Sequence, residues 1–323
     1  MQQRQLGRFG RVSVLTLGGG GLGQLWGETS RAECVATVRA AVDAGIDLLD
    51  LAPRYGDGEA ERVVGAAFEG KLPAGVRVTS KCLLGDTPPA EVEARLRQSL
   101  ADSLDRLRLP RLDLFFLHSN IVPDDHEMRR GPLAAQRATP ISTYREAVRP
   151  AMAKFVAEGL VAHWGITAIG HPDALEQALA EDPKPTAAQC IGNPLDSAGE
   201  LQFFDGALRP RDVIATANAN GVGVLGIRAV QGGALTESLD RDLPAEHGVV
   251  RDFARAARFR ALAAELGEPA ARLAHRYALS MDGIATVVLG VKNRAELADC
   301  VAAAEAGPLP ADTIARIDAS VAP

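Results

Sequence analysis

Residues 76–119 contain the pattern that decides the fold. They read VRVTSKC (76–82), then PPAEVEARLRQSLADSLDRLRL (88–109), then LDLFFLHS (112–119). Two short apolar runs of strand length flank a charged stretch with helical periodicity. Pro88 and Pro89 stand at the expected start of that helix, where proline costs least. Parallel strands need a crossover of this length, so the stretch predicts a β–α–β unit.

The same alternation continues in both directions along the chain, with a helical stretch after each apolar run. Further strands are expected at 14–21, 46–52, 161–167, 187–193, 222–228 and 286–291, and one continuous helix is expected at 251–267. Residues 4–14 (RQLGRFGRVSV) predict a short N-terminal hairpin, and two long segments, 120–142 and 231–250, interrupt the pattern. Eight strands each followed by helix predict a TIM-type (β/α)8 barrel. Since no Pro, Gly and Ser-rich linker or fixed-period repeat occurs, we expect one domain over residues 1–323.

Composition excludes several classes of protein. The 323 residues are 47% hydrophobic, enough for a large core, and the net charge of −6 argues against binding to nucleic acid or anionic membranes. The chain has neither a signal-peptide pattern nor an apolar window long enough to span a membrane. The four cysteines are scattered and the six histidines show no metal-binding spacing. We therefore expect a soluble, cytoplasmic protein without a metal, acting as a monomer or small homo-oligomer.

Four polar residues stand at or just beyond strand ends. Asp50, Lys81 and His118 fall late in their apolar runs, and Tyr55 follows Asp50 in a loop. Barrel enzymes carry their active sites at the C-terminal strand ends, so these side chains should meet. Lys81 would lower the pKa of Tyr55, Asp50 would hold Lys81, and His118 would orient a carbonyl oxygen. The alternative is that Asp50 and Lys81 form only a buried structural ion pair.

This constellation resembles the aldo-keto reductase superfamily. Further segments, LTLGGGGLGQLWG (15–27), WGIT (164–167) and VVLGVKNRAEL (287–297), fit the same family. The resemblance implies reversible hydride transfer between NADP(H) or NAD(H) and an aldehyde, ketone or sugar hydroxyl. Tyr55 would be the general acid and base. The glycine-rich 17–27 region and the long segment after His118 resemble the aldose dehydrogenase branch, which oxidises sugars at the anomeric carbon.

The resemblance also assigns residues to the nicotinamide end of the cofactor. Thr167 and Gln189 would hydrogen-bond the carboxamide. Ile227 would cover the nicotinamide ring where many members place an aromatic side chain. Arg228 would contact the diphosphate or the substrate, or would form a surface salt bridge instead.

At the adenosine end, Gly290, Lys292 and Asn293 match the residue types expected around a 2′-phosphate and its ribose, and Asp299 matches an adenine contact. Glu296 departs from the family pattern, because Arg or Gln is commoner there. A carboxylate repels a 2′-phosphate but can accept a hydrogen bond from a ribose hydroxyl. NADP(H) is the family default, and NAD(H) is the alternative.

Other interpretations stay open at this stage. Trp26 would form a wall of the substrate pocket or pack beneath its own loop. The protein would be a sugar dehydrogenase, a general carbonyl reductase, or a nucleotide-binding regulatory subunit with slow turnover. A barrel lyase or isomerase would use Lys81 to form a Schiff base.

Overall fold

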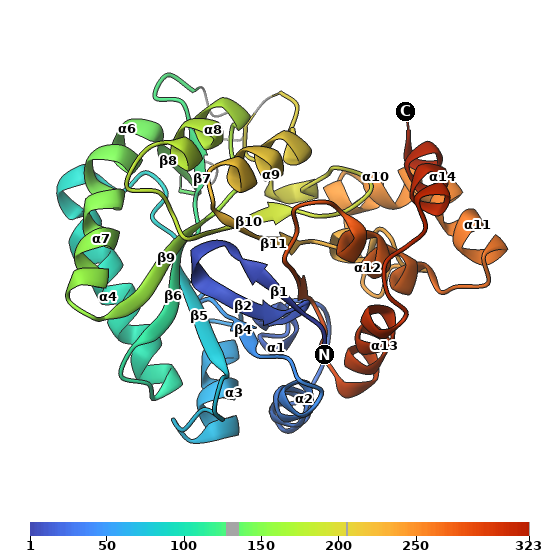
Figure 1. Cartoon of the computed structure of the whole chain (residues 1–323), viewed down its shortest axis with the longest axis horizontal. Helices are drawn as coiled ribbons and strands as arrows, with labels where there is room; N and C mark the ends of the chain where they lie inside the picture. The colour runs from blue at the N-terminus through green and yellow to red at the C-terminus, as the bar shows by residue number, and fades with distance from the viewer. Residues whose placement is uncertain (127–135, 205, 323) are drawn as a thin grey trace.

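The computed structural model describes residues 1–126, 136–204 and 206–322 and has a closed barrel of parallel strands at its centre (Figure 1). The predicted TIM-type barrel is confirmed. Around the barrel, the strands follow the order β10-β11-β12-β3-β4-β5-β6-β9. Their bounds are β3 (Leu15–Gly18), β4 (Leu48–Asp50), β5 (Arg77–Cys82), β6 (Leu112–Leu117), β9 (Val161–Thr167), β10 (Ala187–Ile191), β11 (Gly223–Ile227) and β12 (Thr286–Leu289).

The predicted hairpin closes the N-terminal end of the barrel. Strands β1 (Gln3–Leu6) and β2 (Gly10–Ser13) pair antiparallel around the 3-10 turn η1 (Gly7–Phe9). Gly7 lies so close to the first residue of β11 that a Cβ on it would meet the Gly223 nitrogen at 2.5 Å. Leu6 and Phe9 pack into the apolar cluster at this end. Because the hairpin blocks one end, a site within the barrel must open at the other.

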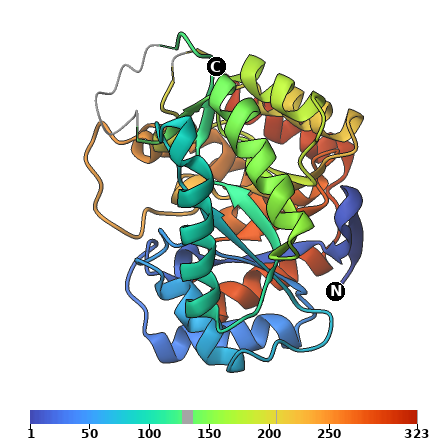
Figure 2. The same cartoon turned by 90° about the vertical axis from the view of Figure 1, so that its left-hand side faces the viewer.

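The outer layer consists of helices, and Figure 2 shows α4 and α7 crossing in front of the strands. The longer helices are α2 (Arg31–Asp43), α3 (Glu59–Phe68), α4 (Pro89–Leu107), α7 (Arg149–Ala157), α8 (Pro172–Ala180), α9 (Pro210–Ala219), α10 (Gly248–Arg255), α11 (Ala257–Glu265), α12 (Ala270–Ser280), α13 (Arg294–Glu305) and α14 (Ala311–Val321). Short turns are α1 (Gly19–Leu22), α6 (Ile141–Thr143), η2 (Tyr144–Val148), η3 (Gly199–Leu201) and η4 (Gln231–Gly233).

Three local predictions differ from the structure. The first barrel strand ends at Gly18, and the glycines after it form the helical turn α1. The helix expected at 251–267 is broken at Ala256, because α10 packs against η3 and η4 while α11 packs against α14. Segment 120–142 contains regular structure: β7 (Asn120–Val122) and β8 (Ala138–Pro140) pair in parallel, which provides partners for part of their backbone groups. Residues 127–135 of that segment lie outside the described residues.

Alternation along β5 sorts its side chains into two sets. Thr79 and Lys81 point to the barrel interior, where both contact Asp50. Ser80 points outward and donates to buried Glu61 on α3, with 2.5 Å between the oxygens. Cys82 also faces the helical layer, and burial raises the pKa of its thiol to about 11. The strand therefore delivers its lysine to the interior and keeps its cysteine out of the site.

Candidate active site

Lys81 is the centre of a buried cluster at the C-terminal ends of β4 and β5. Its ammonium donates to Asp50 Oδ2 at 2.7 Å, to the Leu51 carbonyl at 2.8 Å and to Tyr55 Oη at 3.3 Å. Asp50 is the last residue of β4 and pairs in register with Thr79 of β5, two residues before Lys81. Lys81 is 0% exposed and Asp50 is 2% exposed. The strand ends therefore bring the carboxylate, ammonium and phenol together.

His118 completes the group of four from the end of β6. Its backbone N–H donates to the Cys82 carbonyl at 2.7 Å, and its ring stands edge-on to Tyr55 with centroids 5.9 Å apart. Burial, together with the positive charges of Lys81, Arg54 and Arg137, holds the pKa of His118 well below its usual range. The imidazole is therefore neutral near pH 7, so one ring nitrogen can donate and the other can accept.

Burial shifts the pKa of Tyr55 more than the neighbouring Lys81 ammonium does. Burial raises the pKa of Tyr55 above its ordinary value, Lys81 lowers it and Asp50 raises it again. The contribution of Lys81 has the expected direction, but the expected net lowering of the pKa is not found. Burial alone would lower the pKa of Lys81, yet Asp50 and Tyr55 outweigh it and raise that pKa. A charged ammonium is not a nucleophile, which disfavours the Schiff-base interpretation.

Asp50 has two further hydrogen-bond donors. Its Oδ1 accepts from Thr79 Oγ1 and from Gln189 Nε2, each at 2.7 Å. Gln189 comes from β10, where it pairs in register with Thr167 of β9, and Thr167 Oγ1 donates to Gln189 Oε1 at 3.4 Å. Thr167 and Gln189 thus lie directly beside the group formed by Asp50, Tyr55, Lys81 and His118, called the tetrad below. Sequence reasoning missed Thr79, although its place two residues before Lys81 on one strand could have identified it.

Ile227 and Arg228 lie at the end of β11. Ile227 pairs in register with Ile191 of β10. The Arg228 guanidinium bonds both Glu200 carboxylate oxygens at 3.1 and 3.2 Å, and its Nε donates to Gln231 Oε1 at 2.7 Å. Its side chain is only 8% exposed. Among the alternatives for Arg228, the structure therefore contains the salt bridge, in a largely buried form.

The residues after β12 form a second lysine–carboxylate cluster. Lys292 Nζ lies 2.5 Å from Glu296 Oε1 and 3.1 Å from Asp240 Oδ2. Asn293 is the N-cap of α13, and its side chain accepts from the Glu296 N–H at 2.9 Å. Asp299 is 73% exposed and pairs with Arg272. Sequence reasoning missed Asp240, because it lies in an irregular loop with no periodic signal.

Trp26 packs beneath loops near this second cluster. A Cβ on Gly20 or Gly290 would lie 2.5 or 3.3 Å from the indole nitrogen of Trp26. The Arg241 guanidinium stacks over the Trp26 ring, 5.4 Å from its centroid. Trp26 therefore joins the loop after α1 to Gly290 and to the loop that carries Arg241, which agrees with the packing alternative.

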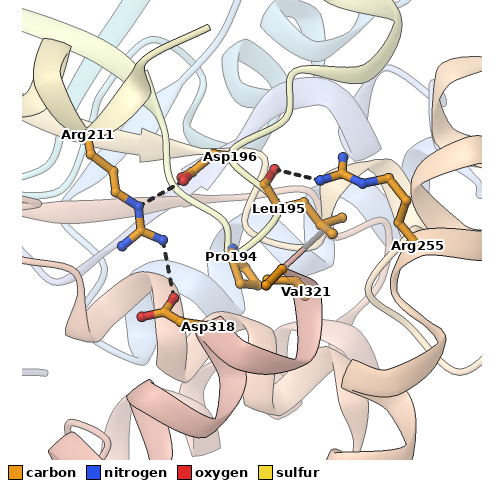
Figure 3. A pocket seen from close by; sticks show the side chains of 8 residues that line it. Pro194, Leu195, Asp196, Arg211, Arg255, Asp318 and Val321 are labelled. Atoms are coloured by element: carbon orange, nitrogen blue, oxygen red, sulfur yellow. Dashed lines mark hydrogen bonds and ion pairs between the residues drawn. The ribbon is translucent and has the colours of Figure 1, made fainter. Parts of the chain in front are cut away.

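A cavity of about 350 Å³ lies elsewhere, between the loop after β10 and helix α14 (Figure 3). There, Arg211 bonds Asp196 at 2.9 Å and Asp318 at 3.3 Å, and Arg255 donates to the Leu195 carbonyl at 3.4 Å. None of the tetrad residues lines it. The described residues contain no cluster suited to a metal ion and no helix long and apolar enough to cross a membrane.

The chain is similar to several known proteins. Residues 14–322 match the profile of the Aldo/keto reductase family. The chain is 26% identical to L-galactose dehydrogenase of Arabidopsis thaliana, covering 100% of this chain and 95% of that protein. It is 27% identical to D-threo-aldose 1-dehydrogenase of a Pseudomonas species, covering 88% and 87%. An aldo-keto reductase from Bacillus halodurans in its holo form superposes with a TM-score of 0.72 at 22% identity, covering 100% and 97%.

The barrel and the matched profile define the class of protein, an oxidoreductase of carbonyl compounds built on a (β/α)8 scaffold. The chain belongs to the aldo/keto reductase family.

Proposed function

We propose that the protein is a nicotinamide-dependent sugar dehydrogenase that oxidises an aldose at its anomeric hydroxyl, with Tyr55 as the proton carrier. The observation that carries the proposal is the 3.3 Å contact between Tyr55 Oη and the buried Lys81 ammonium, with His118 edge-on to the same ring. The relatives matched over most of their length include two sugar dehydrogenases.

The residues divide the proton chemistry between them. Tyr55, as phenolate, accepts the proton of the sugar hydroxyl during oxidation and returns it during reduction. Lys81 stabilises the phenolate, and Asp50 keeps Lys81 in place. A neutral His118 donates a hydrogen bond to the substrate oxygen. A bound nicotinamide cofactor would supply the acceptor for the hydride of the anomeric carbon.

The residues beside the tetrad fit a nicotinamide cofactor. Thr167 and Gln189 bring a hydroxyl and an amide to the strand ends next to Asp50, and these groups suit a carboxamide. Ile227, at the end of β11, offers an aliphatic face for the ring. In this proposal Arg228 contributes through its contacts with Glu200 and Gln231, which fix the chain after β11.

The second lysine cluster supports NAD(H) rather than NADP(H). Lys292 is the cation expected at a 2′-phosphate, but its ammonium already contacts two carboxylates, Glu296 and Asp240. A phosphate would have to compete with Glu296 and Asp240 for the Lys292 ammonium and would be repelled by both carboxylates, whereas a ribose hydroxyl could donate to Glu296. Asn293 and Gly290 shape the turn into α13, and Asp299 lies further along that helix.

The test is turnover with a panel of neutral sugars and both cofactors, followed by the absorbance of reduced nicotinamide. Tyr55→Phe should lower kcat about 10²- to 10⁴-fold, because it removes a general acid–base group, while cofactor binding persists. Tyr144→Phe is the matched control, since Tyr144 is a buried tyrosine whose hydroxyl donates to the Ala178 carbonyl at 3.3 Å. Full activity of Tyr55→Phe would contradict the mechanism.

A regulatory role is the second candidate. The chain is 24% identical, over 96% of its length, to a probable voltage-gated potassium channel subunit beta of Oryza sativa subsp. japonica. The complete tetrad favours turnover over slow sensing. Cofactor binding without measurable turnover on any sugar or carbonyl in the panel would favour the regulatory role instead.

A further inference from the structure

One hydrogen bond crosses the interior of the barrel. In the strand order, β4 and β10 are separated by three strands in either direction, so they lie opposite each other. Gln189 on β10 nevertheless reaches Asp50 on β4, with 2.7 Å between Nε2 and Oδ1. Both residues are 2% exposed. The contact is therefore a buried link between the tetrad and the opposite side of the barrel.

The orientation of the Gln189 amide follows from its partners. The Asp50 carboxylate, which pairs with Lys81, accepts hydrogen bonds and has none to donate, so the amide nitrogen must face it. The amide oxygen then faces Thr167, whose hydroxyl donates to it at 3.4 Å. The Gln189 amide nitrogen thus donates to Asp50 of the tetrad, and its amide oxygen accepts from Thr167 on β9.

We propose that Gln189 is a positioning residue for proton transfer, acting through Asp50 and Lys81 on Tyr55. This role goes beyond the carboxamide contact implied by family resemblance, and it rests on the proposed function of Tyr55. Thr79 and Gln189 together occupy Asp50 Oδ1, which leaves Oδ2 for Lys81. The two donors thereby fix which oxygen of Asp50 faces the lysine.

The hydrogen bonds to Asp50 Oδ1 should influence the pKa of Tyr55 in a definite direction. The negative charge of Asp50 raises the pKa of Tyr55, and Lys81 lowers it. Each donor to Oδ1 compensates part of the Asp50 charge. Removing a donor leaves that charge less compensated, so the pKa of Tyr55 should rise. Sugar oxidation, which needs the phenolate, should then begin at higher pH.

The experiment compares three variants by the pH dependence of kcat for sugar oxidation. Gln189→Met keeps the approximate length of the side chain but removes the donor. Thr79→Val removes the other Oδ1 donor from the β5 side. Thr16→Val, the comparison variant, removes a buried hydroxyl of β3 that bonds Thr286 and touches neither Asp50 nor Gln189. In the first two variants, we expect the part of the profile where kcat rises with pH, the rising limb, to shift upward by about half a pH unit. At a given pH on that limb, kcat should therefore be roughly threefold lower.

A direct titration of Tyr55 provides a second measurement. The chain has only three tyrosines, and burial raises the pKa of both Tyr144 and Tyr277. The difference in ultraviolet absorbance between each variant and its Tyr55→Phe counterpart therefore isolates the ionisation of Tyr55. Gln189→Met should shift this ionisation upward, and Thr79→Ser should restore the position lost in Thr79→Val.

The outcomes are separable. A higher KM for cofactor in Gln189→Met, with the rising limb and Tyr55 ionisation unmoved, would overturn the inference and leave Gln189 as a cofactor contact. If Gln189→Met fails to fold, judged by circular dichroism, Gln189→Asn provides the same test, because its shorter amide falls short of Asp50. Full activity of Tyr55→Phe would overturn the proposed function itself. If Tyr55→Phe is inactive but the rising limb of Gln189→Met and Thr79→Val does not move, only this inference is overturned.

Discussion

Each end of the candidate site contains a lysine–carboxylate ion pair, and the two pairs differ in their exposure to solvent. The Lys81 and Asp50 side chains are 0% and 3% exposed, whereas the Lys292 and Glu296 side chains are 20% and 36% exposed. The lengths of the two pairs, 2.7 and 2.5 Å, are similar. Solvent makes the difference: a buried charge needs its partner, while an exposed pair can open and accept a ligand. We therefore propose that the buried pair keeps a fixed geometry for proton transfer, whereas the exposed pair can rearrange when a cofactor binds.

The largest expected effect comes from removing each lysine in turn. Lys81→Met leaves the Asp50 carboxylate buried without its cation, which should cost about 3–5 kcal/mol of unfolding free energy and abolish turnover. Lys292→Met should cost less than about 1 kcal/mol, because that pair is partly solvated. Urea denaturation of both variants measures the difference. Equal losses of stability would show that the two pairs do not differ in the way their burial indicates.

The second prediction concerns pH. Because burial keeps the pKa of Tyr55 above its ordinary value, the phenolate fraction below that pKa rises tenfold per pH unit, and kcat for oxidation should rise about 100-fold from pH 7 to 9. Reduction, which uses the protonated phenol, should be flat over that range. With its pKa lowered, His118 stays neutral and should add no inflection near pH 6.5.

The proposed adenosine end, around Lys292, should behave differently between pH 7 and 9. Burial lowers the pKa of Lys292, but its hydrogen bonds to Glu296 and Asp240 outweigh burial and raise that pKa. Its charge is therefore constant between pH 7 and 9, and KM for cofactor should not change. A kcat that is independent of pH, or a KM that follows the rise in kcat, would contradict the contrast between the two ends.

The same contrast explains how much the sequence could predict. Asp50, Lys81 and His118 end strands of a barrel, and the closure of the barrel alone brings strand ends together. Their meeting therefore follows from the pattern of apolar runs. Lys292 pairs with Asp240, which lies in a loop, and Arg228 pairs with Glu200, which lies in the short turn η3. No periodicity in the sequence determines the conformation of either segment. The pKa direction of Tyr55 also required the structure, because burial, rather than the lysine predicted beside it, decides the sign.

A smaller effect is expected from reversing the charge of Glu296. Glu296→Arg removes a carboxylate bonded to Lys292 and adds a cation that can pair with a 2′-phosphate. The ratio of kcat/KM for NADP(H) to that for NAD(H) should rise about tenfold, the equivalent of about 1.4 kcal/mol. Glu305→Arg makes the same charge change at the far end of α13, about 13 Å along the helix, and controls for net charge. An equal rise in the control would mean that Glu296 does not act locally.

The smallest effect is expected from Asp240→Asn, which removes the second carboxylate on Lys292 but keeps the shape of the side chain. Asp240 is 43% exposed, so salt already screens the pair, and the NADP(H) to NAD(H) ratio should rise only about two- to threefold at low ionic strength. The rise should disappear near 1 M salt, where screening acts over about 3 Å. Asp242→Asn, two residues along the same loop, is the matched control. A rise that survives high salt would mean that Asp240 acts by shaping the loop, and the adenosine end would then resemble the fixed tetrad more than an adjustable surface.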